Sequence, residues 1–157
     1  MSDTPLGIYL NDHLAGSVGA LEMVERVIEE NAGNPFARKL EDLLREIRAD
    51  QSVLQDLIQR IGSREHPIKK AGAWLAEKVS RIKMSGSDLP DELARMEVLE
   101  TLSVALQGKL ALWRTLRAVA DRHPALRELD LDRLERRGTD QFNRVEELRL
   151  EAARAVL

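Results

Sequence analysis

The chain has 157 residues, 43% of them hydrophobic and 32% charged, with two Trp, one Tyr, two Phe, no cysteine and a net charge of -3. This length supports one hydrophobic core, and a mixture so poor in aromatic residues is typical of helical bundles, so we expect a single all-α domain over residues 1–157. The lack of cysteine excludes disulfides, thiol nucleophiles and iron–sulfur sites, and the weakly acidic charge gives no general attraction to nucleic acid.

Two long helices are predicted in the first third of the chain. Thr4 followed by Pro5 is typical of a helix start, with an N-cap residue and a proline in the first turn. The segment 31–35, Asn-Ala-Gly-Asn-Pro, ends this helix and begins the next, which we expect to run to about Ile61 and stop at Gly62. Because the link is short, the two helices should be antiparallel neighbours.

The rest of the chain predicts a crossover and a second pair of long helices. Residues 68–83 form a shorter amphipathic pattern, which we interpret as a crossover helix. After a loop at residues 85–92, a third long helix runs to about Ala120, where His123-Pro124 ends it. The last helix begins near Asp130, a candidate N-cap, and continues to the end of the sequence.

Each of the four long helices carries an apolar seam at alternating three- and four-residue spacing. The seams are Leu10, Leu14, Ser17, Leu21, Val24, Ile28; Phe36, Leu40, Leu43, Ile47, Asp50, Leu54, Leu57, Ile61; Met96, Leu99, Ser103, Leu106, Leu110, Trp113; and Leu131, Leu134, Gly138, Gln141, Val145, Leu148, Ala152. This spacing predicts a four-helix bundle with its apolar stripes turned inward.

One polar residue interrupts each seam near its middle, and together these residues predict a buried polar layer. They are Ser17, Asp50, Ser103 and Gln141. A buried polar group fixes helix register, because only the correct alignment satisfies its hydrogen bonds. Asp50 is the one carboxylate among them, and we expect it to bond to Ser17, Ser103, Gln141 or His13 across the core.

In helix count, crossover position and polar mid-layer, the chain resembles the ferritin-like superfamily over nearly its whole length. The resemblance implies an antiparallel bundle whose second and third helices are joined by the crossover. It also implies a mid-height iron or manganese site built from glutamates and Glu-x-x-His motifs.

No Glu-x-x-His occurs here, since the residues three before His13, His66 and His123 are Leu10, Ser63 and Ala120. We therefore expect no catalytic residue and no cofactor. Iron or manganese is the alternative, with His13, Asp50, Glu25 and Glu100 as the candidate ligands.

A run of small residues at 15–20, Ala-Gly-Ser-Val-Gly-Ala, places two glycines inside the first helix. Each costs about 1 kcal/mol relative to alanine, so a structural reason is expected. One interpretation is close approach by the crossover segment or a second subunit. The other is that the exposed backbone borders a ligand pocket, with Trp74 or Trp113 as its wall.

The third helix has more apolar surface than one seam uses. Val98, Leu112 and Val119 lie on roughly the opposite side of the helix. This second face predicts a homodimer interface, unless the crossover helix covers it.

These patterns leave three functions open. We expect a cytoplasmic protein without a nucleic-acid or membrane partner, because we expect no exposed aromatic residues interleaved with the basic residues of the crossover segment, and no stretch approaches the ~20 apolar residues of a membrane span. The first function is non-catalytic action through self-association or a protein partner, in housekeeping or stress response. The alternatives are a metal-dependent ferritin-like oxidoreductase and a small-ligand-binding bundle with a cavity near Ser103 and Gln107.

Overall fold

The computed structural model describes residues 4–64 and 91–157, and every element in these ranges is helical. Four long helices account for most of them: α1 (Pro5–Glu30), α2 (Pro35–Arg60), α4 (Asp91–Val119) and α5 (Leu131–Val156). Two short 3-10 helices, η1 (Ala120–Arg122) and η2 (Pro124–Leu126), join α4 to α5. The predicted all-α class is confirmed, whereas the predicted crossover helix at 68–83 lies outside the described residues.

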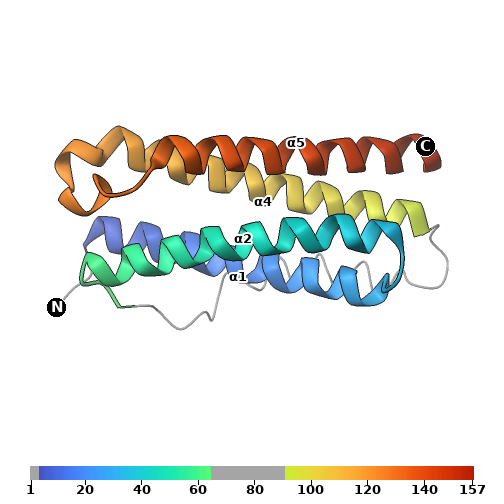
Figure 1. The fold of residues 1–157 in the computed structure, drawn as a ribbon, viewed down its shortest axis with the longest axis horizontal. Coiled ribbons are helices and arrows are strands. Elements are labelled where there is room, and N and C mark those ends of the chain that lie inside the picture. The colour runs from blue at the N-terminus through green and yellow to red at the C-terminus, as the bar shows by residue number, and fades with distance from the viewer. Residues whose placement is uncertain (1–3, 65–90) are drawn as a thin grey trace.

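The long helices form two antiparallel hairpins that lie against each other (Figure 1). α1 and α2 make one hairpin, α4 and α5 make the other, and α1 contacts α4 between them. α2 ends at one end of the bundle and α4 begins at the other, so these two helices run in the same direction (Figure 1). The order of two hairpins separated by a long connection agrees with the order predicted from the sequence.

The helix starts are fixed by the polar side chains that the sequence places there. The side chains of Thr4, Asn34 and Asp130 accept hydrogen bonds from backbone N–H groups of the first turns of α1, α2 and α5, at 3.1, 3.0 and 2.9 Å. Gly33 and Gly62, at φ 82° and 70°, follow the ends of α1 and α2 and adopt the left-handed conformation that glycine tolerates. The predicted starts and stops are therefore confirmed to within about a residue.

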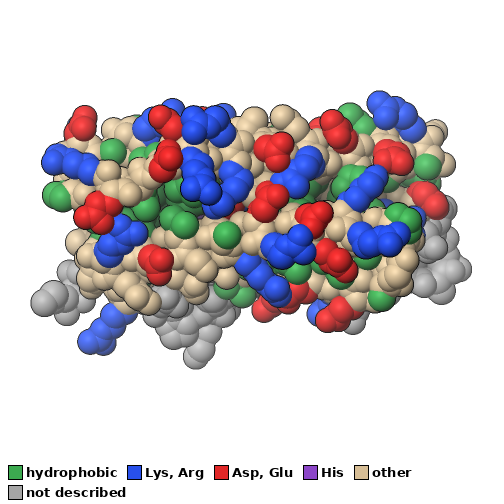
Figure 2. Space-filling model, in the orientation of Figure 1, with side chains coloured by type: hydrophobic (Ala, Val, Ile, Leu, Met, Phe, Trp, Pro, Cys, Tyr) green, Lys and Arg blue, Asp and Glu red, His purple; other side chains and the backbone are tan. Residues whose placement is uncertain are grey.

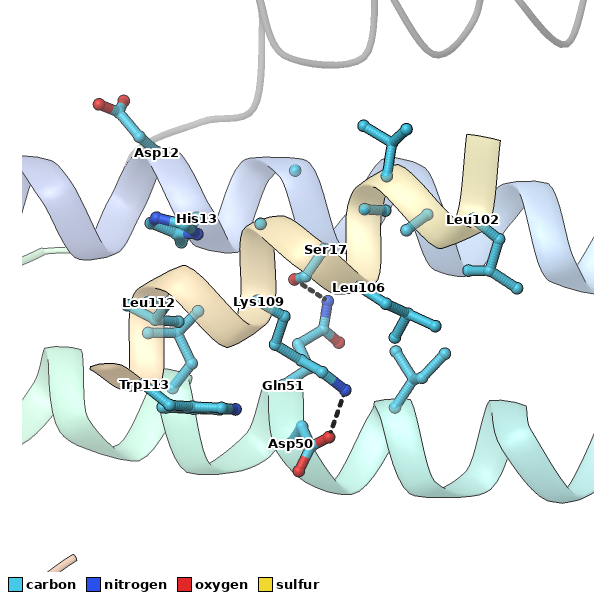
Figure 3. Close-up of a pocket in the computed structure, with 17 residues that line it drawn as sticks. Asp12, His13, Ser17, Asp50, Gln51, Leu102, Leu106, Lys109, Leu112 and Trp113 are labelled. Carbon is cyan, nitrogen blue, oxygen red and sulfur yellow. Dashed lines mark hydrogen bonds and ion pairs between the residues drawn. The ribbon is translucent and has the colours of Figure 1, made fainter. Parts of the chain in front are cut away.

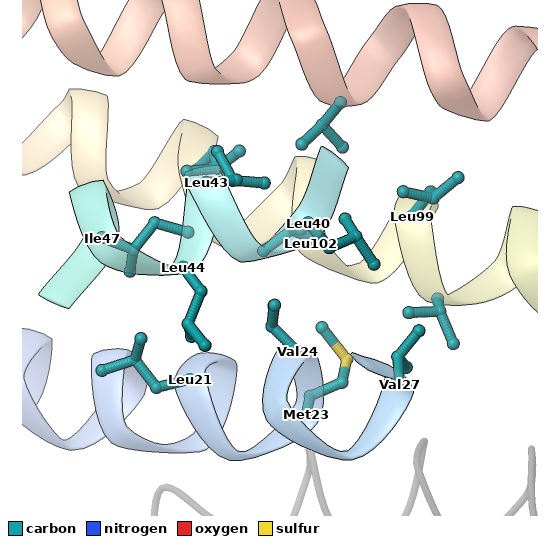
Figure 4. Close-up of a cluster of buried hydrophobic side chains, with 13 residues drawn as sticks. Leu21, Met23, Val24, Val27, Leu40, Leu43, Leu44, Ile47, Leu99 and Leu102 are labelled. Carbon is teal, nitrogen blue, oxygen red and sulfur yellow. The ribbon is translucent and has the colours of Figure 1, made fainter. Parts of the chain in front are cut away.

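The predicted seams form the core, which divides into two clusters of buried side chains. The first core cluster contains Leu21, Met23, Val24, Val27, Leu40, Leu43, Leu44, Ile47, Val98, Leu99, Leu102, Leu106 and Val145 (Figure 4). The second core cluster contains Leu10, Leu14, Leu54, Leu57, Ile58, Leu112, Trp113, Leu116, Leu126, Leu131 and Leu134. Along α2, Asp50 lies between the parts that contribute to the two clusters.

The second apolar face of α4 is used inside the chain. Val98 is a member of the first core cluster and Leu112 of the second, and both are almost fully buried. Val119 packs against the second cluster. The extra apolar surface that suggested a homodimer interface is thus packed within one chain and does not by itself support a dimer, which stays a prediction.

The surface is rich in charge of both signs. On the face shown in Figure 2, lysine and arginine side chains alternate with aspartate and glutamate. Arg114 and Arg117 on α4 share Glu135 on α5, and Arg60 donates to Glu128 at 3.0 Å. In the described ranges no helix combines the length and apolar character needed to cross a bilayer.

Candidate functional site

A pocket of about 400 Å³ lies between α1, α2 and α4, at the height where the two core clusters meet (Figure 3). Apolar side chains make most of its wall, namely Ile47, Leu54, Leu102, Leu106, Leu112 and Trp113. Polar side chains join them at His13, Ser17, Asp50, Gln51 and Lys109. Exposed Asp12 and Val104 lie at the rim. The volume falls in the lower part of the roughly 300–1,000 Å³ range of small-molecule sites.

Glycines on two facing helices keep the pocket wide. Gly16 of α1 and Gly108 of α4 both border it, and a Cβ atom built on either would meet no atom within 4 Å. No described helix therefore approaches Gly16 closely, and the crossover segment, the other neighbour that the sequence suggested, lies outside the described residues. As the second interpretation expects, Gly16, Ser17 and Ala20 border a pocket that has Trp113 in its wall, whereas Gly19, the other glycine of the run, is buried and does not line it. Trp74 lies outside the described residues.

Asp50 is the centre of the polar layer. Its side chain is 2% exposed and accepts from Lys109 Nζ at 2.6 Å, from Gln141 Nε2 at 3.2 Å and from Arg137. Gln141 is fully buried, and its carbonyl oxygen accepts from the same Lys109 ammonium. The predicted bond between Asp50 and Gln141 is confirmed, and two cations that the sequence prediction did not include stand beside it.

The layer continues from Gln141 to the surface through Glu46. Gln141 Nε2 donates to Glu46 Oε2 at 3.1 Å, and Arg144 donates to the same carboxylate. Burial acts to raise the pKa of Glu46. The hydrogen bonds from Arg144 and Gln141 and the positive charges of Arg144 and Arg137 outweigh this effect, so the pKa of Glu46 lies below its usual value. The layer thus links α2, α4 and α5 and reaches solvent on the α5 side.

The other predicted members of the layer bond elsewhere. Ser17 is half-buried, donates to the Leu14 carbonyl at 2.7 Å and accepts from Gln51 Nε2 at 2.9 Å. Ser103 is 9% exposed and donates to Glu146 at 3.4 Å. Asp50, Ser103 and Gln141 are buried as predicted, but neither serine has a hydrogen bond to Asp50 among the described residues, so the four interruptions do not share one hydrogen-bonded layer. Long side chains from the seam margins take the positions that these short hydroxyl groups cannot reach.

Two titratable groups of the pocket have shifted pKa values. Burial lowers the pKa of Lys109, and Arg137 adds to this, while Asp50 and Glu46 act in the opposite direction. Burial also lowers the pKa of His13 below 6.5, with Asp12 opposing it. The His13 ring packs edge-on against Tyr9, with the ring centroids 4.7 Å apart. Burial thus favours the neutral form of His13, while Asp50 and Lys109 form an ion pair in the pocket wall.

The candidate metal ligands are not brought together. Glu25 pairs with Arg48, Glu100 lies 3.5 Å from Arg149, and His13 packs on Tyr9. In residues 4–64 and 91–157, no three His, Asp or Glu side chains are grouped so that they would hold a metal ion. The oxygens of Asp50 are occupied by nitrogen donors.

A pocket lies near Ser103 and Gln107, as expected for a ligand-binding bundle. Ser103 and Gln107 do not line the pocket, although their neighbours Leu102, Val104 and Gly108 do. The pocket lies on the side of α4 that faces α1, whereas Ser103 turns toward Glu146 of α5. A residue-by-residue helical assignment of the α4 faces would have distinguished these two sides.

Lys109 and Arg137 were missed because they do not occupy seam positions. Each immediately precedes a seam residue, Leu110 or Gly138, and its long aliphatic stem lets the charge reach inward from the margin. The feature of the sequence that could have identified these two residues is Asp50. A seam carboxylate requires a cation, and long basic residues next to the facing seams are the groups able to supply one.

Gly138 brings α4 and α5 close together at this height. A Cβ atom there would lie 3.0 Å from Leu110 Cδ2. The close approach places Arg137 and Gln141 of α5 within reach of Asp50.

Comparison of the chain with protein-family models, with curated proteins and with solved structures found no match.

Proposed function

We propose that the protein binds a small, largely apolar ligand in the pocket between α1, α2 and α4. The observation that carries this proposal is the pocket of about 400 Å³ at mid-height, lined mainly by leucines and Trp113 together with a few polar groups. Apolar walls provide binding energy, and a small number of fixed polar groups provide orientation, which is the usual composition of a small-molecule site.

The two glycines support a ligand site. Each weakens its helix by about 1 kcal/mol relative to alanine. Open space beyond Gly16 and Gly108 means that packing within the described residues does not offset this cost. Retaining access to the pocket is a reason for both glycines, because any larger side chain would narrow it.

The role is binding, not redox chemistry. Both oxygens of Asp50 accept hydrogen bonds from nitrogen groups, so a metal ion would have to displace Lys109 and Arg137. The contacts of Asp50 therefore favour ligand binding over the iron or manganese alternative. The burial of the second apolar face of α4 likewise favours a ligand over a second subunit as the binding partner.

We also propose that the helices follow ferritin-like connectivity. α2 and α4 run in the same direction (Figure 1), and this supports a single long connection between the second and third bundle helices. In this proposal the bundle retains the ferritin-like helix order and uses its mid-height for a ligand.

The proposal is tested with a substitution that fills the pocket without lowering the stability of the protein. Gly108→Leu should raise the stability of the free protein, because leucine is the better helix former, and should abolish ligand binding. The probe is octanamide, a neutral amphiphile, and the measurements are calorimetric titration and the melting temperature. At a concentration 100 times its Kd, a ligand stabilises the folded state by about 2.7 kcal/mol.

Ala111→Leu is the matched control. Ala111 is an exposed α4 residue outside the pocket, so the same side chain is added to the same helix without narrowing the cavity. This variant should bind octanamide as the wild type does. Equal binding by Gly108→Leu and wild type would overturn the proposed site.

A further inference from the structure

The indole N–H of Trp113 is a buried donor without an acceptor. Trp113 is 1% exposed, and its Nε1 makes no hydrogen bond within the described part of the chain. An unsatisfied buried donor costs about 1–3 kcal/mol, so buried indole nitrogens usually have a partner. The cost disappears when an acceptor enters the pocket that Trp113 lines.

The unpaired N–H is directed toward the charged part of the pocket. In Figure 3 the nitrogen-bearing end of the Trp113 ring faces the side on which Lys109 and Asp50 lie. Trp113 and Lys109 are four residues apart on α4, so their side chains project from successive turns of the same helix face. One oxygen-bearing group in the pocket would lie between these two donors.

Lys109 supplies positive charge that Asp50 does not fully neutralise. Asp50 is shared between Lys109 and Arg137, while Glu46, the other carboxylate of the layer, pairs with Arg144, so two cations share one buried carboxylate. The ammonium has three hydrogens, of which Asp50 and Gln141 accept two. Asp12, the other acid that lines the pocket, is exposed at the rim and points away from Lys109 (Figure 3). The floor of the pocket therefore favours an anion.

We propose that the ligand is a carboxylic acid with an apolar body, whose carboxylate accepts hydrogen bonds from Trp113 Nε1 and Lys109 Nζ. This inference rests on the proposed function and assigns its ligand class. The body lies against the leucines of α4, Leu102, Leu106 and Leu112, which line the same pocket. Arg137 also pairs with Asp50, so that carboxylate keeps a cationic partner when the Lys109 ammonium donates a hydrogen bond to the ligand.

The experiment compares three eight-carbon probes that differ only in head group: octanoate, octanamide and octylammonium. Calorimetric titration of the wild type should give an affinity for octanoate at least about tenfold above that for octanamide, because charge-assisted hydrogen bonds are roughly twice as strong as neutral ones. Octylammonium should bind most weakly. Octanoate should also move the indole N–H proton resonance of Trp113 downfield, and Trp113→Phe assigns that signal against Trp74.

Two substitutions test the two donors separately. Lys109→Met removes the ammonium while Asp50 keeps Arg137 and Gln141, and it should bring the octanoate and octanamide affinities to about the same value. Trp113→Phe removes the N–H and keeps an aromatic wall, and it should reduce the preference for octanoate without abolishing it. Lys39→Met makes the same change of charge at an exposed position of α2 and should leave the preference at its wild-type value.

The outcomes separate this inference from the function on which it rests. If wild type binds octanoate and octanamide equally, and Gly108→Leu abolishes both, the carboxylate inference is overturned while the ligand site stands. Tighter binding of octylammonium than of octanoate overturns it as well. If none of the probes binds, the proposed function fails together with the inference. Should Lys109→Met not fold, the wild-type head-group preference and the Trp113 resonance decide the question.

Discussion

At the scale of single residues, Asp50 determines the chemistry of the bundle interior. A carboxylate that is 2% exposed would be strongly disfavoured alone, and here it is stabilised by three nitrogen donors from two other helices. Two of these donors, Lys109 and Arg137, are cations, and both pair with Asp50. The consequence is that Asp50 cannot be replaced without leaving buried positive charge.

Asp50→Ala should therefore lower the free energy of unfolding by about 3–5 kcal/mol, the cost of breaking a buried ion pair by removing one partner. Asp50→Asn should recover only part of this loss, since an amide keeps an acceptor but carries no charge. Urea denaturation measures both values.

Glu46→Ala is the comparison for that measurement. Glu46 and its partner Arg144 are about one-third exposed, so their ion pair should contribute about 1 kcal/mol or less. Unfolding curves of Asp50→Ala and Asp50→Asn that coincide with the wild-type curve would show that the layer is not a coupled network.

Some residues of the site could be predicted from the sequence and others could not. Asp50 and Gln141 were found because a polar residue on an apolar seam departs from the pattern. Lys109 and Arg137 were not, because a basic residue beside a seam has the same pattern as any solvated helix face. Their inward reach depends on side-chain conformation and on the close approach at Gly138, which spacing alone does not encode.

At the scale of elements, the four long helices follow local signals closely. Each apolar seam is inside, and the caps at Thr4, Asn34 and Asp130 lie where the sequence predicted or permitted them. These features are local, so sequence reasoning recovers them. The pocket is different, because it arises from the distance between α1 and α4 at two glycines that are far apart in the sequence.

The start of α5 provides a prediction at this scale. Asp130→Ala removes the acceptor for the backbone N–H of Arg133 and should destabilise the protein by about 1 kcal/mol. Hydrogen exchange should accelerate first in the opening turn of α5, where the N–H loses its acceptor. Asp132→Ala, which removes an exposed acid from the same turn without removing a cap, should have a smaller effect, and equal exchange in the two variants would contradict the capping role.

At the scale of the whole molecule, the bundle has two apolar cores with a polar layer and a pocket between them. Leu99 belongs to the first core cluster and Ile58 to the second, and both are fully buried. Because the clusters share no member, each should respond to substitution without repacking the other. The order of the helices was predictable from sequence, but this division of the core was only suggested by the seam interruptions.

A double-mutant cycle tests the independence of the cores. Leu99→Ala should cost about 2–5 kcal/mol and Ile58→Val about 0.5–1.5 kcal/mol. The double variant should cost their sum to within about 0.5 kcal/mol, as measured by chemical denaturation. A coupling energy well above that value would mean that the polar layer transmits packing changes from one core to the other.

The walls of the pocket come from both hairpins, α1 and α2 on one side and α4 on the other. A molecule bound there would contact both hairpins at once and would link them through its own contacts. It would stabilise the folded bundle by the free energy of its binding, because separating the hairpins requires expelling it. Occupancy of one cavity at mid-height would in this way set how readily the whole bundle comes apart.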